Sequence, residues 1–264
     1  YMMNVHIPSI TTLTKAFSAR RAESKAAAAP KPQRELPKRS DVMAVFDLEG
    51  TVVDSNIVRQ YLWVRAAGVR KAAWPAEAAR ILFSLRRYLR TERSDRGEFI
   101  RSFLRRYAGM PVKRLERIVN SSGYAATVKR HTSPGAIAAI ARHRAAGHRT
   151  VLVTGSIEDL TAPIANLFDD VVGGHMHERN GKLTGYLAKP PLVDEARAAW
   201  LRKYAAEHGF DLAASYGYGD SHADLGWLEL LGNPTAVNPD TQLAREAQRR
   251  GWRIEKWKRG RRAD

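Results

Sequence analysis

The chain has 264 residues and no cysteine. This absence excludes disulfide bonds, a thiolate nucleophile, and zinc or iron–sulfur sites that depend on cysteine ligands. It is typical of a protein in a reducing compartment, so we expect a cytoplasmic location. No apolar run approaches the roughly 18 residues that a membrane-spanning helix needs, and the first residues contain no apolar signal core.

Acidic residues are scarce relative to basic ones. The sequence has 27 Asp and Glu against 44 Lys and Arg, which gives a formal net charge of +17 at pH 7. Such a surplus favours anionic partners, which include phosphorylated small molecules, anionic lipid surfaces and nucleic acid. Zinc-finger spacing and a glycine–aromatic RNA-binding signature are both missing, so specific nucleic-acid recognition is not expected. Peripheral association with an anionic membrane surface stays open.

The stretch AVFDLEGTVVD at residues 44–54 organises the rest of the chain. Its apolar run ends abruptly in Asp47 and Glu49, before Gly50 and Thr51 turn the chain. Strand alternation predicts that both carboxylates point the same way as the chain leaves the sheet. Two acids at the end of a buried strand are costly unless a cation lies beside them, and oxygen ligands suit Mg²⁺. The stretch therefore predicts a magnesium site, with a solvated acidic turn as the alternative.

Two more apolar strands end in polar residues further along the chain. The strand ends read VLVTGS at 151–156 and YGYGDSHAD at 216–224, and their polar residues are Thr154, Gly155, Asp220 and Asp224. A basic residue, Arg197, lies between them near the start of a helical pattern. This order of motifs, over roughly residues 41–257, resembles the haloacid dehalogenase superfamily of phosphotransferases, and within it the phosphoserine-phosphatase-like branch.

The resemblance implies a role for each of the motif residues. Asp47 matches the nucleophile that attacks phosphorus and forms an aspartyl-phosphate. Glu49 stands at the position of the acid that protonates the leaving oxygen and then activates water. Thr154 matches the hydroxyl that holds a phosphoryl oxygen, helped by the amide of Gly155. A basic residue, Arg197 in this alignment, lies on the phosphate side.

The resemblance also implies Mg²⁺ as the cofactor. Its ligands would be Asp47, the main-chain carbonyl of Glu49, and Asp220, with Thr51 and Asp224 in supporting places. The metal would then span carboxylate and phosphate and screen the repulsion between two anions.

Two positions depart from the family pattern. Glu49 stands where the family has aspartate, and a displacement of about one ångström can cost on the order of 10²-fold in rate. We therefore expect Glu49→Asp to raise the rate on small phosphomonoesters. Arg197 stands where the branch has lysine, and a guanidinium fork is not equivalent to a compact ammonium. Lys189 is the alternative cation.

The function predicted first is a phosphomonoesterase. The alternative is a degenerate domain that serves as an anion-binding or scaffolding module of a larger, lipid-metabolising enzyme.

Strands that alternate with helices predict an α/β fold, a doubly wound parallel sheet with helices on both faces. Ligands bind such sheets at the carboxyl ends of the strands, where the motif residues fall. The expected strands cover residues 41–47, 148–153, 170–172, 213–217, 235–238 and 252–255. The expected helices cover residues 134–146, 158–168, 194–208 and 241–250. A hairpin is expected at 176–187, because Asn180-Gly181 is a strong type I′ turn signal.

Residues 55–133 are expected to form a helical cap inserted after the first strand. Apolar residues recur there at helical spacing in three sets, Ile81 to Leu89, Phe99 to Tyr107, and Leu115 to Val119. The predicted organisation is a basic N-terminal tail or linker at 1–40, with a helical pattern over 8–29, a core at 41–54 and 134–257, the cap at 55–133, and a basic C-terminal tail at 258–264.

The cap selects the substrate in this superfamily, so the resemblance also bears on specificity. Asn56 stands where phosphoserine phosphatases have a glutamate for the substrate amino group, and the arginine-rich cap suits a more anionic substrate. Relatives in the branch include lipid-phosphate phosphatases and modules fused to lipid-metabolising domains. The expected partner is thus a small-molecule or lipid-linked phosphate, with a fused catalytic domain as a further partner. Near the C-terminus, Trp257 and its basic neighbours predict a membrane-surface anchor or a solvated tail.

Overall fold

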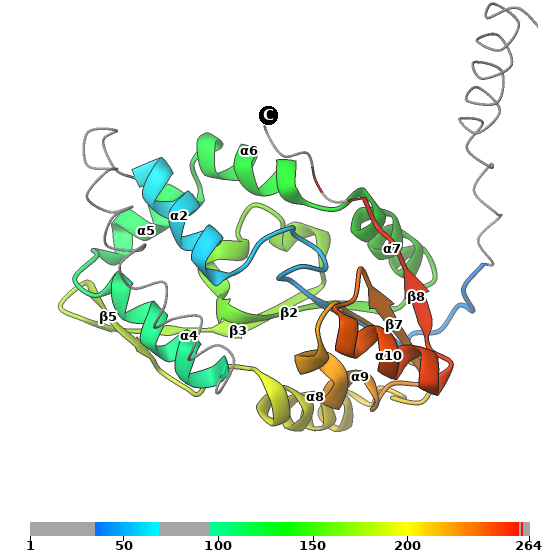
Figure 1. The fold of residues 1–264 in the computed structure, drawn as a ribbon. Coiled ribbons are helices and arrows are strands. Elements are labelled where there is room, and N and C mark those ends of the chain that lie inside the picture. The colour runs from blue at the N-terminus through cyan, green and yellow to red at the C-terminus, as the bar shows by residue number, and fades with distance from the viewer. Residues whose placement is uncertain (1–34, 69–95, 259, 261–264) are drawn as a thin grey trace, which may run out of the picture. The chain divides into compact units, whose positions relative to one another are not determined.

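A computed structural model describes residues 35–68, 96–258 and 260 (Figure 1). The chain divides into two compact units, Tyr1–Glu35 and Leu36–Asp264, and all elements below belong to the second unit. Two predicted helices, the one over 8–29 and the cap helix carrying Ile81 to Leu89, lie outside the described residues.

The core is a six-stranded parallel sheet with strand order β3-β2-β1-β6-β7-β8 (Figure 1). The strands are β1 Met43–Asp47, β2 Arg149–Ile157, β3 Asp170–Gly174, β6 Tyr216–Gly219, β7 Asn233–Val237 and β8 Arg253–Glu255. The helices of the core are α7 Pro134–Ala145, α8 Asp194–His208, α9 Leu225–Leu228 and α10 Thr241–Arg250. This architecture confirms the predicted doubly wound parallel sheet.

Alternate residues of β1 pack against different helices. Ala44 and Phe46 belong to the apolar cluster that includes residues of α7. Met43 and Val45 belong to a second cluster with residues of α8, α9 and α10. Since side chains alternate along a strand, Asp47 at the end of β1 continues the face of Met43 and Val45. The sequence of β1 thereby directs Asp47 toward α8 and α9.

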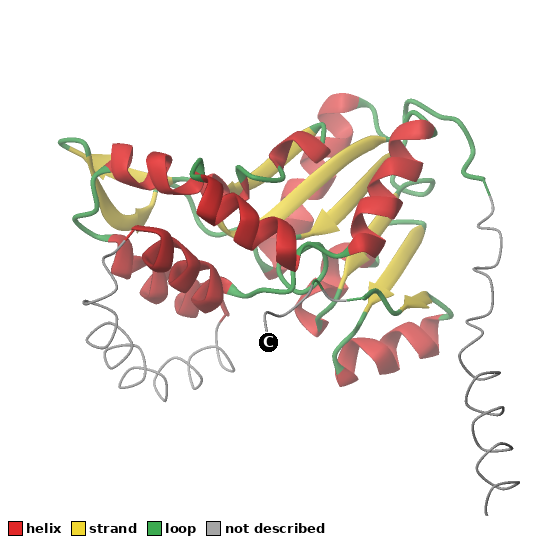
Figure 2. Cartoon of the chain, turned by 90° about the horizontal axis from the view of Figure 1, so that it is seen from above, coloured by secondary structure: helices red, strands yellow, loops and turns green. Residues whose placement is uncertain are grey.

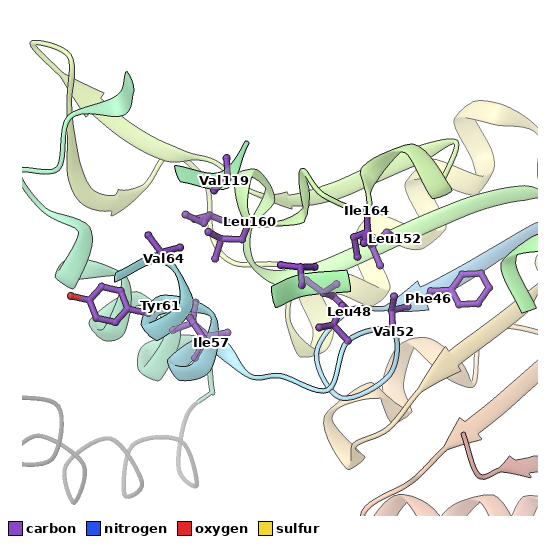
Figure 3. Packing of buried hydrophobic residues seen from close by; sticks show 14 of the residues in the cluster. Phe46, Leu48, Val52, Ile57, Tyr61, Val64, Val119, Leu152, Leu160 and Ile164 are labelled. Atoms are coloured by element: carbon purple, nitrogen blue, oxygen red, sulfur yellow. The ribbon is translucent and has the colours of Figure 1, made fainter. Parts of the chain in front are cut away.

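The cap consists of short helices that surround an apolar centre. They are α2 Ile57–Gly68, α4 Arg96–Leu104, the 3₁₀ turn η2 Arg105–Tyr107, α5 Val112–Val119 and α6 Ser122–His131. One apolar cluster runs from Phe46 and Leu152 in the sheet to Tyr61 and Val64 in α2 and Val119 in α5 (Figure 3). In the described part of the cap, the apolar helix faces are therefore packed core.

The predicted hairpin is present but lies on the cap. Its strands are β4 Met176–Arg179 and β5 Lys182–Leu187, and both turn residues, Asn180 and Gly181, have the positive φ that a type I′ turn requires. The amide of Gly109 donates to the carbonyl of Leu183 at 2.8 Å. Figure 2 shows this small sheet apart from the main one and beside helices. The hairpin thus packs with the cap, although the predicted boundaries placed it in the core.

Three further predictions need correction. Residues 158–168 form two 3₁₀ turns, Glu158–Thr161 and Ala165–Leu167, because Pro163 lacks the N–H that a continuous helix would use. Strand β6 covers residues 216–219, later than the predicted 213–217. Strand β2 extends past its expected end, with irregular pairing between Val153 and Ile157.

The C-terminal aromatic residue is part of the core. Trp257 is 9% exposed, its ring centroid lies 5.6 Å from that of Tyr218, and its Nε1 donates to Glu255 at 2.7 Å. This burial corrects the expectation of an exposed anchor or solvated tail at Trp257. No helix within the described ranges is long and apolar enough to cross a membrane.

Candidate active site

The carboxyl ends of three neighbouring parallel strands bring the motif residues together. Asp47 ends β1 and pairs with Val153, so Thr154 follows directly at the same edge of the sheet. Asp220 comes immediately after β6, which is the other neighbour of β1. Because parallel strands end at one edge, residues that are far apart in the sequence meet there.

A buried guanidinium links two buried carboxylates at this edge. Arg197 Nη1 donates to Asp47 Oδ1 at 2.7 Å and to Asp224 Oδ1 at 3.0 Å. Its Nε donates to the carbonyl of Leu192 at 3.1 Å, which fixes the plane of the guanidinium. All three charged residues are at most 3% exposed. A single buried guanidinium therefore faces two buried carboxylates.

Burial raises the pKa of Asp47 well above its ordinary value. The negative charge of Asp224 adds to this rise, whereas Arg197 opposes it. One cation does not offset the desolvation of two carboxylates, so the ionised form of Asp47 would gain from a further positive charge.

Asp224 is held by donors on both of its oxygens. Besides Arg197, its Oδ1 accepts from Trp227 Nε1 at 3.0 Å. Its Oδ2 accepts from the amides of Asp220 and Ser221 at 3.2 and 3.1 Å, and from Ser221 Oγ at 3.3 Å. Asp224 thereby orients Arg197 and the loop that carries Asp220. Its own role is a supporting one.

Three carboxylates at this edge lie close enough together to be candidate ligands of a divalent metal. One oxygen each of Asp47, Asp220 and Asp224 lies within 4.8 Å of the others. Asp47 Oδ2 is buried and has no hydrogen-bond partner among the described residues. Because Asp224 is already saturated with donors, Asp47 and Asp220 are the carboxylates that suit Mg²⁺, a cation that prefers oxygen ligands.

Gly50 makes the close approach of Asp220 feasible. Its φ is +84°, and a Cβ on it would lie 2.0 Å from Asp220 Oδ2. Any side chain at this position would therefore displace the carboxylate, besides straining the backbone. The position of Asp220 in the last motif therefore requires a glycine at position 50 in the first motif.

Glu49 has a different set of partners from Asp47. Its Oε1 accepts from Thr154 Oγ1 at 2.6 Å and from Gln60 Nε2 at 3.3 Å. Its Oε2 is buried without a hydrogen-bond partner in the described part of the chain. Strand β1 ends at Asp47 and Glu49 lies in the following turn, so the predicted alternation does not extend to it. The surroundings of the two acids therefore differ. Asp47 contacts a charged guanidinium, whereas Glu49 accepts from neutral donors.

The model of the haloacid dehalogenase-like hydrolase family matches residues 44–229. The chain belongs to this family. A histidinol-phosphatase of Neisseria meningitidis is 25% identical over 236 residues, which are 80% of this chain and 97% of that protein. A probable phosphatase of Mycobacterium tuberculosis is 29% identical over 226 residues, 82% of this chain and 75% of that protein.

Solved structures share the fold of this chain. A protein of unknown function from Bordetella pertussis superposes with a TM-score of 0.69 at 26% identity, covering 82% of this chain and 99% of that one. A substrate-bound phosphoserine phosphatase superposes with a TM-score of 0.59 at 19% identity, covering 84% and 95%. At this identity the second likeness shows the fold alone.

The two candidate cations of this family member lie in different places. Arg197 reaches Asp47, as described above. Lys189 is exposed and lines a cavity of about 290 Å³ together with Arg101, Arg105 and Tyr186 from the cap and hairpin. Among these two, the structure brings only Arg197 to the carboxylates.

Three further predicted residues, Gly155, Thr51 and Asn56, have different surroundings. A Cβ on Gly155 would lie 2.9 Å from Val193 and 3.3 Å from Ile100 of the cap, so the cap approaches the end of β2 closely. Thr51 is buried, and its Oγ1 has no hydrogen-bond partner among the described residues. Asn56 is exposed and its Oδ1 accepts from the amide of Arg59 at 2.9 Å, which caps α2. Its contact with substrate stays a prediction.

Sequence reasoning assigned no role to Trp227 and Gln60, which both touch the acids. Trp227 donates to Asp224, and no local pattern distinguishes it from an ordinary core tryptophan. Gln60 donates to Glu49, and its signal was present: it lies among Ile57, Tyr61 and Val64 on the buried face of α2. A polar side chain on an otherwise apolar helix face needs a buried partner.

Proposed function

We propose that the protein is a Mg²⁺-dependent phosphomonoesterase that works through an aspartyl-phosphate on Asp47. The observation that carries the proposal is the state of this side chain. Asp47 is buried, Arg197 holds its Oδ1, and its Oδ2 has no partner among the described residues. A buried carboxylate with one anchored oxygen and one unsatisfied oxygen is arranged to bind or attack something that enters the site.

The residues around Asp47 divide the work of the two chemical steps. A carboxylate oxygen of Asp47 attacks phosphorus, the bond to the ester oxygen breaks, and Glu49 gives its proton to the departing oxygen. Glu49 then takes a proton from water, whose oxygen attacks phosphorus and releases Asp47 and phosphate. Arg197 stabilises the negative charge on Asp47 and on the entering phosphate.

Thr154 and Gly155 are placed to hold phosphoryl oxygens at the end of β2. The single hydroxyl proton of Thr154 is donated to Glu49 in this structure. Binding of a phosphoryl oxygen would therefore redirect that proton. Mg²⁺ bound by Asp47, Asp220 and the carbonyl of Glu49 would screen the repulsion between carboxylate and phosphate.

Small phosphorylated molecules are the substrate class that the relatives support. Histidinol-phosphatase and phosphoserine phosphatase, the names that two of them carry, each act on a small phosphate ester. A lipid-linked phosphate remains the finer proposal, and it is favoured by the net charge of +17. Turnover of a phosphate ester in anionic vesicles, neutral vesicles and free solution separates the two.

The test of the proposal combines turnover with metal binding. Wild-type protein with Mg²⁺ should hydrolyse small phosphomonoesters, whereas Asp47→Asn should lose at least about 10³-fold in kcat, since the covalent step is removed. Asp220→Asn should weaken Mg²⁺ binding in calorimetry, and Glu195→Gln, which removes an exposed charge on α8, should not. Equal rates for wild type and Asp47→Asn would refute the mechanism.

The alternative is a binding module that holds phosphate without hydrolysing it. The replacements of aspartate by Glu49 and of lysine by Arg197 favour it. In the same experiment, this alternative gives phosphate and Mg²⁺ binding that depend on Arg197 and Asp220, without turnover of any ester.

A further inference from the structure

Gln60 is a buried amide that comes from the cap and touches the acid of the core. It is 3% exposed and lies on the helix face that otherwise carries Ile57, Tyr61 and Val64. Its Nε2 donates to Glu49 Oε1 at 3.3 Å and to Ser55 Oγ at 3.1 Å. Gln60 therefore connects α2 of the cap with the turn that follows β1.

The carbonyl oxygen of the same amide has no donor in the described part of the chain. Gln60 Oε1 is buried and makes no hydrogen bond to any described residue. An unsatisfied buried acceptor is destabilising, and a ligand that supplies the missing donor would relieve that cost. Turning the amide over would place Oε1 against the carboxylate of Glu49, so the present orientation is the favourable one.

We propose that Gln60 positions Glu49 for proton transfer and, through its free Oε1, recognises a donor on the leaving group. The inference rests on the proposed function, in which Glu49 protonates the departing oxygen. A side chain next to that carboxyl is next to the alcohol that departs. The substrate class is a phosphate ester whose alcohol carries a hydroxyl or ammonium group close to the ester oxygen.

The unusual length of Glu49 gives Gln60 its role. A glutamate has one more rotatable bond than an aspartate, and ordering that bond has an entropic cost. Two neutral donors, Thr154 from the sheet and Gln60 from the cap, meet the same oxygen, Oε1, and leave Oε2 without a partner among the described residues. If Thr154 turns to a phosphoryl oxygen, Gln60 is the donor that still holds Glu49 in place.

Leaving-group chemistry distinguishes positioning from a merely structural role. An alkyl phosphate needs a proton on its departing oxygen, whereas nitrophenyl phosphate releases a stable phenolate without one. The ratio kcat/KM reports on this first step. We expect Gln60→Met, which keeps the size and removes both polar atoms, to lower kcat/KM about 10- to 100-fold for an alkyl phosphate and less than about 3-fold for nitrophenyl phosphate. Gln248→Met on the exposed face of α10 is the matched control and should change neither.

A second set of substrates tests whether Gln60 Oε1 accepts a hydrogen bond from the leaving group. Wild type should prefer 2-aminoethyl or 2-hydroxyethyl phosphate over ethyl phosphate, and Gln60→Met should lose this preference. Equal losses for alkyl and nitrophenyl esters, or an unchanged preference, would overturn the inference while the proposed function stands. If wild type hydrolyses none of these esters, the proposed function itself fails, and the role of Gln60 with it. A thermal melt of each variant shows that the fold is intact.

Discussion

Two buried polar networks start from the neighbouring strands β1 and β6, and they differ in charge. At the carboxyl edge, Asp47, Arg197 and Asp224 form an ionic network. Behind it, Tyr218, His143 and His148 form a neutral chain that ends at the carbonyl of Pro37. Phe46 precedes Asp47 in β1 and stacks on Tyr218 with 4.6 Å between ring centroids. Because side chains alternate along a strand, Phe46 and Asp47 point to opposite faces, so the sheet lies between the two networks.

The proton positions of the neutral chain follow from its last member. The carbonyl of Pro37 can only accept, so His148 Nε2 must donate to it, at 2.8 Å. When His148 is neutral, its Nδ1 accepts from His143 Nδ1 at 2.9 Å, and His143 Nε2 then accepts from the hydroxyl of Tyr218 at 2.8 Å. Every polar atom of this chain has one partner, and no charge is needed.

The comparison shows how one sheet treats buried polar groups in two ways. The neutral chain is closed: burial lowers the pKa of His143 to about 3, and a positive charge on His148 or on nearby Arg142 would act in the same direction. The ionic network is open, because Asp47 Oδ2 has no partner among the described residues. A closed network stabilises the fold, whereas an open one has a place for a ligand.

Removing the cation should have the largest effect on the ionic network. Arg197→Met leaves Asp47 and Asp224 buried without their shared partner, which should destabilise the protein by about 3–5 kcal/mol. Arg197→Lys keeps the charge but cannot reproduce the bond to Leu192 together with both carboxylate contacts, so its loss should be smaller. Urea unfolding measures both, and Arg202→Met on the exposed side of α8 is the control. Equal stability of wild type and Arg197→Met would show that the ionic network contributes nothing to the fold.

Acid should weaken the neutral chain through His143. The pKa of His143 is about 3 in the folded protein, below its ordinary value of 6.5, so between these values the unfolded chain binds a proton that the folded chain does not. The stability from this residue is therefore complete above about pH 6.5 and is lost as the pH falls toward 3, by about 1.4 kcal/mol per pH unit.

The substitution His143→Gln isolates this term, since it keeps a donor and an acceptor but does not titrate. Urea unfolding at pH 7, 6 and 5 should show a shallower loss of stability for His143→Gln than for wild type. Parallel pH dependences would mean that His143 takes up no proton on unfolding.

The elements of the core could be predicted because their signals are local. The helix at 194–208 and the helix at 241–250 have the predicted bounds, and the apolar strands end at the predicted acids. The helix predicted at 158–168 was wrong, because Pro163 lies within it and cannot donate the N–H of a continuous helix.

Contacts between distant segments could not be predicted from local patterns. The choice between Lys189 and Arg197 depends on how the hairpin folds onto the cap, which no spacing reveals. The neutral chain joins residues from α7, β6 and the segment before β1, and each of them alone resembles an ordinary core residue. Gln60 was recognisable as an anomaly, but its partner Glu49 was not.

Shortening Glu49 tests the acid that lies two residues after Asp47 of the ionic network. The sequence alone led to the expectation that Glu49→Asp raises the rate. The structure reverses this prediction, because Thr154 and Gln60 donate to the oxygen of the longer side chain, and withdrawing it by about one ångström loses both contacts. We expect kcat/KM for an alkyl phosphate to fall about tenfold, less than the roughly 10²–10⁴-fold contribution of general acid catalysis, because the carboxyl is displaced and not removed. A faster Glu49→Asp enzyme would restore the earlier expectation.

The smallest effect should come from one hydroxyl in the neutral chain. Tyr218→Phe keeps the ring that stacks on Phe46 but leaves His143 Nε2 as a buried acceptor without its donor. Such a loss costs about 1–3 kcal/mol, and we expect the lower end because a single neutral bond is removed. Tyr216→Phe in the same strand is the matched control, since its hydroxyl has no hydrogen-bond partner among the described residues, and it should leave the urea midpoint unchanged. Because the chain is neutral, the cost of Tyr218→Phe should not change with salt. A cost that decreased with added salt would mean that the hydroxyl acts through a charge, and the contrast between the two networks would no longer hold.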